Sequence, residues 1–327
     1  FLVVNSVKAV QLQHYGGSDA LLLVDVDIPT PGDGEVLVRI ESAGVNFIDI
    51  YMREGHYQQS STYGSALPFT LGMEAIGTVV DANGDSRLQV GDRVAYAQGP
   101  LGAYAELHTL PASKVVKLPD FIDFDTAAAS LLKGLTVQYL LRQTYELKGG
   151  ETILFHAAAG GVGLAAVQIA KLTGCRVITT SSTEEKCKRA LELGADAAVN
   201  YREQDVVKEV KALTNNRGVD MVVDNIGEDT WDASVRCLVR GGRITTCGGT
   251  SGYNVPMNIA HVFHKELSII GSNYGLIKEA KTLNKLLDQG MFEVALDRVL
   301  PLKDAAEGHR VLEDRENFGK VVLKPEF

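Results

Sequence analysis

Apolar and polar positions change their rhythm along the chain. In the first third, short apolar runs alternate with turns rich in Gly, Pro, Asn and Asp, which is typical of strands joined by tight turns. The predicted strands are Val36–Ile40, Ile76–Val80, Arg93–Ala97 and Val115–Leu118. This region therefore predicts a compact, mostly β domain.

From Asp125 onward, apolar patterns with helical spacing alternate with short apolar runs. Thr126–Tyr145 predicts a helix in two pieces around Gly134. The predicted strands that follow are Thr152–His156, Arg176–Ser181, Ala197–Asn200, Val219–Asn225, Arg243–Cys247 and Leu267–Gly271. The predicted helices between them are Val162–Thr173, Glu184–Leu193, Gln204–Thr214, Thr230–Leu238 and Ile259–Lys265. This alternation is typical of a doubly wound parallel sheet, whose ligand binds outside the carboxyl ends of the strands.

The C-terminal tail has a third pattern. Ile277–Gln289 and Ala305–Glu313 predict helices, and Gly319–Leu323 predicts a last strand.

The most specific chemical signal lies between the strand at Thr152 and the helix that follows it. Gly161, Gly163 and Ala166 fall on the G-x-G-x-x-A spacing. The first glycine allows a tight turn, the second lets a pyrophosphate approach the backbone, and the small third residue lets helix and strand pack closely. We therefore predict a dinucleotide-binding turn at Gly161, Val162 and Gly163, whose helix N-terminus faces the phosphates.

Composition narrows the function further. The 327 residues suggest about two domains, and 45% hydrophobic residues indicate an ordinary globular protein. A formal net charge of −9 argues against nucleic acid as a partner, because phosphate-backbone binding needs a basic stripe. No apolar run reaches the roughly 18 residues of a membrane helix. The four cysteines form no C-x-x-C pair, which favours a reduced cytoplasmic protein.

Further short motifs occur along nearly the whole chain. They are Gly44–Asn46, Gly72–Gly77, Gly91–Val94 and Phe318–Leu323. With the glycine-rich turn they resemble the medium-chain dehydrogenase/reductase superfamily, and within it the zinc-free quinone oxidoreductase (zeta-crystallin-like) branch. Four segments resemble bacterial NADPH:quinone reductases in particular: Asn46–Asp49, Ala95–Gln98, Leu101–Tyr104 and Lys133–Thr136.

This resemblance implies an α/β protein of two domains with a cleft between them. A GroES-like, mostly β catalytic domain is expected over residues 1–125 and 272–327, and a Rossmann NADP-binding domain with a six-stranded sheet over residues 126–271. It also implies a homodimer, because the strand at Leu267–Gly271 would leave an open sheet edge that a second copy can pair.

Zinc dehydrogenases of the superfamily hold catalytic zinc at positions that resemble Asn46, Met73 and Lys133 here. An amide is a poor zinc ligand, a thioether prefers softer metals, and an ammonium repels a dication. The segment Gln98–His108 is also short and holds no cysteine, so the four-cysteine structural zinc lobe is missing. The sequence therefore predicts no metal.

The end of the second Rossmann strand indicates which nicotinamide cofactor binds. NAD sites place an acid there, about 20 residues past the glycines, to hold the ribose 2′-hydroxyl. Thr179–Thr183 has no acid, although Glu184 and Glu185 follow closely. By resemblance, Ser182, Lys186 and Tyr201 hold a 2′-phosphate. We therefore predict NADPH rather than NADH, although Lys186 taken alone fits a solvated helix lysine equally well.

The resemblance also suggests the catalytic residues. Without a metal, hydrogen-bond donors must stabilise the developing oxyanion. Asn46, Asp49, Tyr51 and Tyr57 resemble residues that line the nicotinamide end of the cleft. The alternative is structural, since Asx residues often hold turns and tyrosines often pack as plain aromatic walls. The further cofactor contacts implied by the family are Thr136, Asn225, Ile226, Gly248 and Asn317.

These observations favour an NADPH-dependent quinone oxidoreductase acting on a small-molecule quinone. An enone, alkenal or enoyl-thioester double-bond reductase of the same branch is the first alternative, because it shares the fold and the cofactor. A role in binding AU-rich RNA or as a structural protein, known among zeta-crystallin relatives, is a remote alternative that the acidic charge disfavours.

Overall fold

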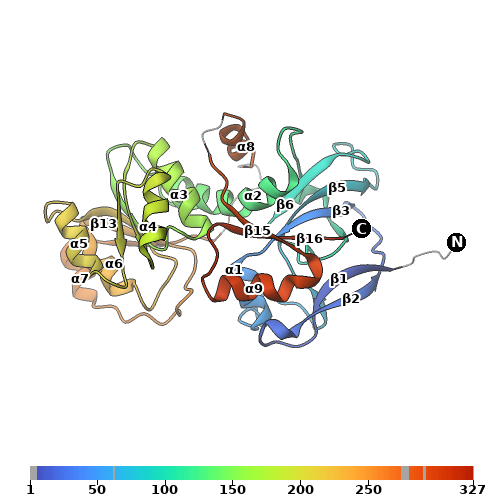
Figure 1. The fold of residues 1–327 in the computed structure, drawn as a ribbon, viewed down its shortest axis with the longest axis horizontal. Helices are drawn as coiled ribbons and strands as arrows, with labels where there is room; N and C mark the ends of the chain where they lie inside the picture. The colour runs from blue at the N-terminus through green and yellow to red at the C-terminus, as the bar shows by residue number, and fades with distance from the viewer. Residues whose placement is uncertain (1–5, 62, 274–279, 290–291, 327) are drawn as a thin grey trace. The chain divides into compact units, whose positions relative to one another are not determined.

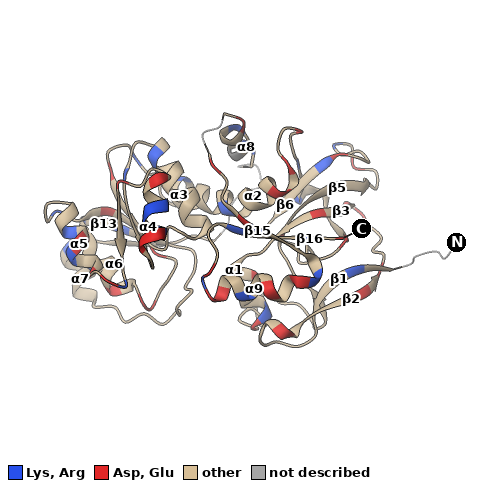
Figure 2. Ribbon diagram, in the orientation of Figure 1, with Lys and Arg blue, Asp and Glu red and all other residues tan. Residues whose placement is uncertain are grey.

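The structure is a computed structural model that describes residues 6–61, 63–273, 280–289 and 292–326. It divides into two compact units (Figure 1). The first contains Phe1–Leu132, Ala280–Gln289 and Val294–Phe327, and the second contains Lys133–Glu279 and Gly290–Glu293. Figure 2 shows that acidic and basic residues are interspersed along the elements of both units.

The first unit is built on two sheets. The smaller has the order β2-β1-β4, and the larger has the order β15-β16-β3-β5-β6-β8 with β7 pairing to β3. Their bounds are β1 Ser6–Leu12, β2 Leu21–Asp27, β3 Glu35–Gly44, β4 Phe69–Thr70, β5 Glu74–Asp81, β6 Arg93–Ala97, β7 Leu107–Pro111, β8 Val116–Lys117, β15 Leu296–Pro301 and β16 Lys320–Lys324. Because β16 pairs antiparallel with β3, the C-terminal tail belongs to the same unit as the first third of the chain.

This unit also contains helices. They are α1 Phe47–Arg53, α8 Ala280–Asp288, α9 Ala305–Glu313 and the first part of α2 Phe124–Gln138, which belongs to the second unit from Lys133 onward. There are 3₁₀ turns at Ser18–Ala20, Ala112–Lys114 and Leu302–Asp304. Alternate residues of β3 (Val36, Val38 and Ile40) are fully buried, as expected for a strand with one face on the core. Val311 and Leu323 belong to the same hydrophobic cluster, so the tail contributes to this core.

The second unit is a Rossmann fold. All pairs in its six-stranded sheet are parallel, in the order β11-β10-β9-β12-β13-β14. The strands are β9 Thr152–Phe155, β10 Arg176–Ser181, β11 Ala197–Asn200, β12 Val219–Val223, β13 Leu238–Thr246 and β14 Ser268–Gly271. The helices are α3 Gly161–Leu172, α4 Glu184–Glu192, α5 Val206–Leu213, α6 Trp231–Cys237 and α7 Ile259–Lys265. The strand order reverses between β9 and β12, which is where such sheets bind ligands.

The α/β fold class and the six-stranded parallel sheet predicted from the sequence are confirmed. One helix prediction was wrong in detail: α2 runs through Gly134 to Gln138, and the irregularity is a π-helical turn at Tyr139–Gln143. Gly134 is buried, so packing offsets the roughly 1 kcal/mol helix penalty of a glycine. The predicted helix at Ile277–Gln289 is observed as α8, and residues 277–279 lie outside the described residues.

In the part of the chain that the structure describes, no helix is long and apolar enough to cross a membrane.

Candidate functional site

The glycine-rich turn joins β9 to α3 in the second unit. A Cβ on Gly163 would lie 2.4 Å from the Cα of Ala158, so backbone leaves room for glycine alone. A Cβ on Gly161 would lie 1.7 Å from Nζ of Lys133, so the lysine side chain packs directly over this glycine. The first turn of α3 leaves backbone N–H groups without intrahelical acceptors. The turn thus combines close backbone approach with a helix N-terminus suited to phosphate.

Four polar side chains are buried beneath this turn. His156, Thr180, Asp224 and Ser234 are each at most 4% exposed. Nδ1 of His156 is 3.1 Å from Oγ1 of Thr180, and its Nε2 is 2.9 Å from Oγ of Ser234. The Ser234 hydroxyl donates to Asp224 over 2.6 Å. These residues come from the ends of β9 and β12, from β10 and from α6, and sequence reasoning missed them.

The residues predicted for the 2′-phosphate lie at the carboxyl ends of β10 and β11. The backbone N–H of Tyr201 donates to the carbonyl of Ser181 over 3.1 Å, which places Tyr201 beside the end of β10. Ser182 follows β10 directly, and Lys186 lies in the first turn of α4, whose N-cap is Thr183. Ser182 and Lys186 are partly exposed and Tyr201 is 37% exposed, so this end of the sheet is accessible.

Asn225, Ile226 and Gly248 lie together at the ends of β12 and β13. The Asn225 side-chain oxygen accepts from the N–H of Cys247 over 2.8 Å, which links the two loops. The carbonyl of Ile226 accepts from the Ser251 hydroxyl over 2.8 Å. Thr136 is buried in α2 within the same unit. Asn317 belongs to the first unit, where its amide donates to the Gly319 carbonyl over 2.8 Å.

Asn46 is held in a buried polar cluster of the first unit. Its amide donates to the carbonyl of Gly44 and to Glu74, over 3.0 and 3.1 Å, and its oxygen accepts from Lys320 over 2.6 Å. The Lys320 ammonium is also 2.6 Å from Glu74, and both side chains are fully buried. Glu74 additionally accepts from the backbone N–H of Leu132. In the sequence, the signal for this buried ion pair is a lysine at the start of the otherwise apolar run of the strand Lys320–Lys324, because a buried ammonium needs a carboxylate partner.

Asp49 is fully buried on the first turn of α1. It accepts from the N–H of Asn46 over 2.9 Å and from the Tyr104 hydroxyl over 3.0 Å. Burial raises its pKa to about 7, although these two hydrogen bonds and the Lys320 charge oppose the shift. Oδ1 of Asp49 has no hydrogen-bond partner among the described residues. Burial thus favours the protonated form of the Asp49 carboxyl.

The predicted tyrosines belong to an aromatic group around the end of α1. Tyr51 stacks on His56 with ring centroids 5.6 Å apart, and it meets Tyr57 edge-on at 6.5 Å. Tyr57 in turn meets Tyr63 edge-on at 5.4 Å. Tyr51 and Tyr57 are partly exposed, so this group offers an aromatic surface to a flat ligand.

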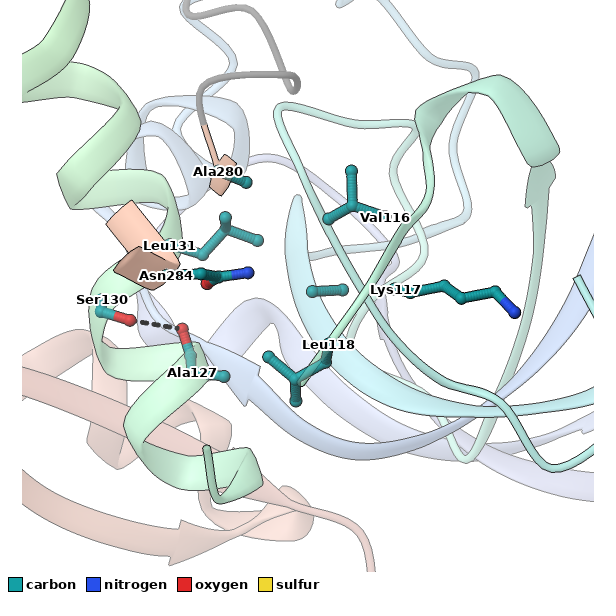
Figure 3. A pocket seen from close by; sticks show the side chains of 9 residues that line it. Val116, Lys117, Leu118, Ala127, Ser130, Leu131, Ala280 and Asn284 are labelled. Carbon is teal, nitrogen blue, oxygen red and sulfur yellow. Dashed lines mark hydrogen bonds between the residues drawn. The ribbon is translucent and has the colours of Figure 1, made fainter. Parts of the chain in front are cut away.

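A small hollow in the first unit does not serve as the substrate site. Figure 3 shows side chains of α2, α8 and the β8 region around it, including Leu131, Asn284 and Leu118. Its volume is about 10 Å³, which is room for about one water molecule. A quinone or nicotinamide ring does not fit there.

Comparison with known proteins identifies the family. A zinc-binding dehydrogenase family matches residues 161–289, and an alcohol dehydrogenase GroES-like domain family matches residues 32–120. The Pseudomonas aeruginosa quinone oxidoreductase is 42% identical over 97% of this chain and 99% of its own length. The chain belongs to the quinone oxidoreductase branch of the medium-chain dehydrogenase/reductases.

Two further similar proteins bear on the chemistry. A crystal structure of the Escherichia coli quinone oxidoreductase complexed with NADPH matches with a TM-score of 0.91 at 39% identity, covering 97% of this chain and 100% of that one. A 2-haloacrylate reductase from Burkholderia is 35% identical over 98% of this chain and 99% of its own length.

The superfamily includes zinc enzymes, but the side chains found here do not fit that metal. The Asn46 amide is bonded to Lys320, whose ammonium is already the positive charge of this cluster. Met73 and Lys133 offer a thioether and a second ammonium. Among the described residues, no three His, Cys, Asp or Glu side chains lie together as a metal-binding group.

Proposed function

We infer that the chain is an NADPH-dependent quinone oxidoreductase. The observation that carries this inference is the 40–42% identity with bacterial quinone oxidoreductases over nearly the whole chain. The neighbour solved with NADPH supports the cofactor. The glycine-rich turn and the absence of an acid at the end of β10 are consistent with it.

Each half of the proposed site has a distinct task. In the second unit, Gly161–Gly163 receive the pyrophosphate, and Ser182, Lys186 and Tyr201 receive the 2′-phosphate. Asn225, Ile226, Gly248 and Thr136 of the same unit are assigned to the ribose and nicotinamide. Asn317, which belongs to the first unit, is assigned as a further cofactor contact. NADPH supplies the hydride when it is bound.

On the substrate side, we assign Asn46, Asp49, Tyr51 and Tyr57. Tyr51 and Tyr57 form an aromatic wall for a flat acceptor. The Asn46 amide must exchange a bond to Glu74 or Gly44 in order to donate to a substrate oxygen. A quinone accepts hydride readily, and its hydroquinone anion is stable without a Lewis acid. This chemistry suits a site that offers hydrogen-bond donors and aromatic side chains in place of a metal.

Double-bond reduction is the second candidate, because a relative named as a 2-haloacrylate reductase is 35% identical over nearly the whole chain. An enone, alkenal or enoyl thioester would accept hydride at its β-carbon, and the enolate that forms would then need a proton at the α-carbon. Quinone reduction remains the preferred function, because the more similar relatives are quinone oxidoreductases.

As part of this proposal we place a homodimer in the cytoplasm. β14 is the last strand of the Rossmann sheet, and Ile269 on it is 39% exposed. Ile259 and Phe263 of α7 are 72% and 60% exposed. Burial of this apolar surface by a second copy would pair the strand edge. The four cysteines are unpaired thiols, which suits a reducing compartment.

Steady-state oxidation of NADPH and NADH tests the function. The acceptors are a benzoquinone, a naphthoquinone and an α,β-unsaturated ketone, each with and without a chelator. The expected result is quinone turnover that prefers NADPH and is unchanged by the chelator. Turnover with the unsaturated ketone alone would contradict quinone reduction and favour double-bond reduction. Loss of activity on chelation would contradict the metal-free site.

A further inference from the structure

The buried side chains beneath the glycine-rich turn form a hydrogen-bond chain with one direction. Asp224 accepts the Ser234 hydroxyl hydrogen, so Ser234 must accept from Nε2–H of His156. His156 then offers Nδ1 as an acceptor to the Thr180 hydroxyl. Oγ1 of Thr180 accepts in turn from the backbone N–H of Ala157 over 3.3 Å. Every donor in this chain of hydrogen bonds therefore has an acceptor.

This assignment requires a neutral His156. Burial lowers the pKa of His156, with the Asp224 charge opposing the shift, so the ring stays neutral near pH 7. The titratable group that faces His156 is Asp224, reached through Ser234. A neutral imidazole with its proton on Nε2 satisfies both neighbours, which is the form that the hydrogen-bond directions demand.

The two ends of the chain lie in the two loops that flank the reversal of strand order. At one end, Ala157 has φ +57°, a left-handed conformation that is costly for a residue with a Cβ. Its N–H is bonded to Thr180, and the carbonyl of Thr180 also accepts from Ala158 over 3.1 Å. Ala157 begins the turn that leads to Gly161. The side chains thus support a strained entry to the phosphate-binding turn.

At the other end, Asp224 organises the loop after β12. Its Oδ1 accepts from the N–H groups of Ile226 and Gly227 over 3.0 and 3.1 Å. Thr230 also donates to it over 2.8 Å. Asn225 and Ile226, which we assign to the cofactor, are therefore fixed by the same carboxylate that ends the hydrogen-bond chain.

We propose that four buried side chains are positioning residues: Thr180, His156, Ser234 and Asp224. They hold the glycine-rich turn and the loop after β12 in the backbone conformations that bind the dinucleotide. They act through the backbone of these two loops and touch neither the substrate nor the reacting atoms. This inference rests on the proposed cofactor site, and it adds to it a buried support that fixes both sides of the phosphate-binding region.

Adjacent threonines on β10 provide a matched test. Thr180→Val removes the hydroxyl of the chain at nearly constant volume. Thr179→Val removes a neighbouring hydroxyl that is equally buried and has no hydrogen-bond partner among the described residues. Dissociation constants for NADPH and NADH, measured by quenching of protein fluorescence, report binding without any quinone. Loss of one buried hydrogen bond predicts roughly five- to tenfold weaker binding of both cofactors by Thr180→Val. Thr179→Val should bind both as the wild type does.

Ser234→Ala extends the test, because the hydroxyl lies at the far end of the chain from Thr180. If the four residues act as a unit, the double variant Thr180→Val/Ser234→Ala binds NADPH no more weakly than the weaker single variant. The kcat at saturating NADPH should change less than the KM. Wild-type affinity in Thr180→Val, or an equal loss in Thr179→Val, would overturn the proposal. Failure of the wild type to bind NADPH would instead refute the proposed cofactor.

Discussion

Asn46 is a residue whose structural contacts are fully defined and whose proposed role in the site depends on them. It caps α1, accepts from the Lys320 ammonium and donates to Glu74, so all its hydrogen-bonding groups are in use. The interpretation of Asn46 as a turn-holding Asx residue agrees with these contacts, and its role as a site residue stays a prediction. The Lys320 ammonium is itself paired with the Glu74 carboxylate over 2.6 Å, so the cluster around Asn46 contains both a positive and a negative charge.

The proposed preference for NADPH over NADH can be tested at Lys186. We expect Lys186→Ala to raise the KM for NADPH about tenfold or more, because a charge-assisted bond to the 2′-phosphate is lost. The KM for NADH should stay the same. Lys188→Ala, on the same helix and exposed, is the control and should leave both values unchanged. An equal rise in the KM for NADPH and for NADH in Lys186→Ala would contradict the assignment of Lys186 to the 2′-phosphate.

The buried carboxyl of Asp49 predicts how the stability of the folded protein changes with pH. Its pKa is about 7 in the folded protein and 3.8 as the ordinary value, so the folded state binds the proton more tightly. Stability from this group is therefore complete below pH 3.8 and is lost as the pH rises to about 7. Three pKa units correspond to an upper limit of roughly 4 kcal/mol.

We accordingly expect Asp49→Asn to unfold at a higher temperature than the wild type at pH 8, with the difference shrinking toward pH 5. The amide keeps an acceptor for the N–H of Asn46 and removes the buried charge. Thermal unfolding of both proteins across this range provides the measurement. A constant difference at every pH would show that Asp49 does not titrate there.

Among the elements, the buried Lys320–Glu74 pair joins β16 to the start of β5. Removing one partner leaves a buried charge without compensation, so Lys320→Met should cost about 3–5 kcal/mol in the free energy of unfolding. Lys320→Met/Glu74→Gln removes both charges and should recover much of that loss. Urea unfolding of the two variants compares them directly. A double variant no more stable than Lys320→Met would contradict a charge-based account.

The elements also show where sequence patterns were sufficient. Strands β10 and β11 have the predicted bounds, because β-branched residues in β10 and the turn residues that flank both strands mark them clearly. The first unit was harder: β1, β2, β4, β7 and β15 and the short helix α1 were not predicted. Strand β2 is largely exposed and β4 has two residues, so neither carries a strong apolar signal.

Across the whole molecule, motifs predicted the glycine-rich turn but not the buried polar side chains beneath it. The G-x-G-x-x-A spacing is local, so the sequence predicted Gly161 and Gly163. His156, Thr180 and Ser234 come together only when two strands and a helix pack, and no local spacing marks them. The buried partners of Asp49 are similarly distant, since Tyr104 reaches it from 55 positions away. The partners of such polar groups are set by tertiary packing, so they are identified only from the structure.

Assembly is the last property to test at this scale. If two copies pair through β14, a charge on its exposed face should separate them, because a lysine on an edge strand disfavours pairing. Ile269→Lys is the variant, and Val299→Lys is a close control, since Val299 is 38% exposed on β15, the edge strand of the other unit. Light scattering at micromolar concentration should give dimers for the wild type and Val299→Lys and monomers for Ile269→Lys. Dimers in all three would place the interface elsewhere, and a monomeric wild type would exclude the proposed assembly.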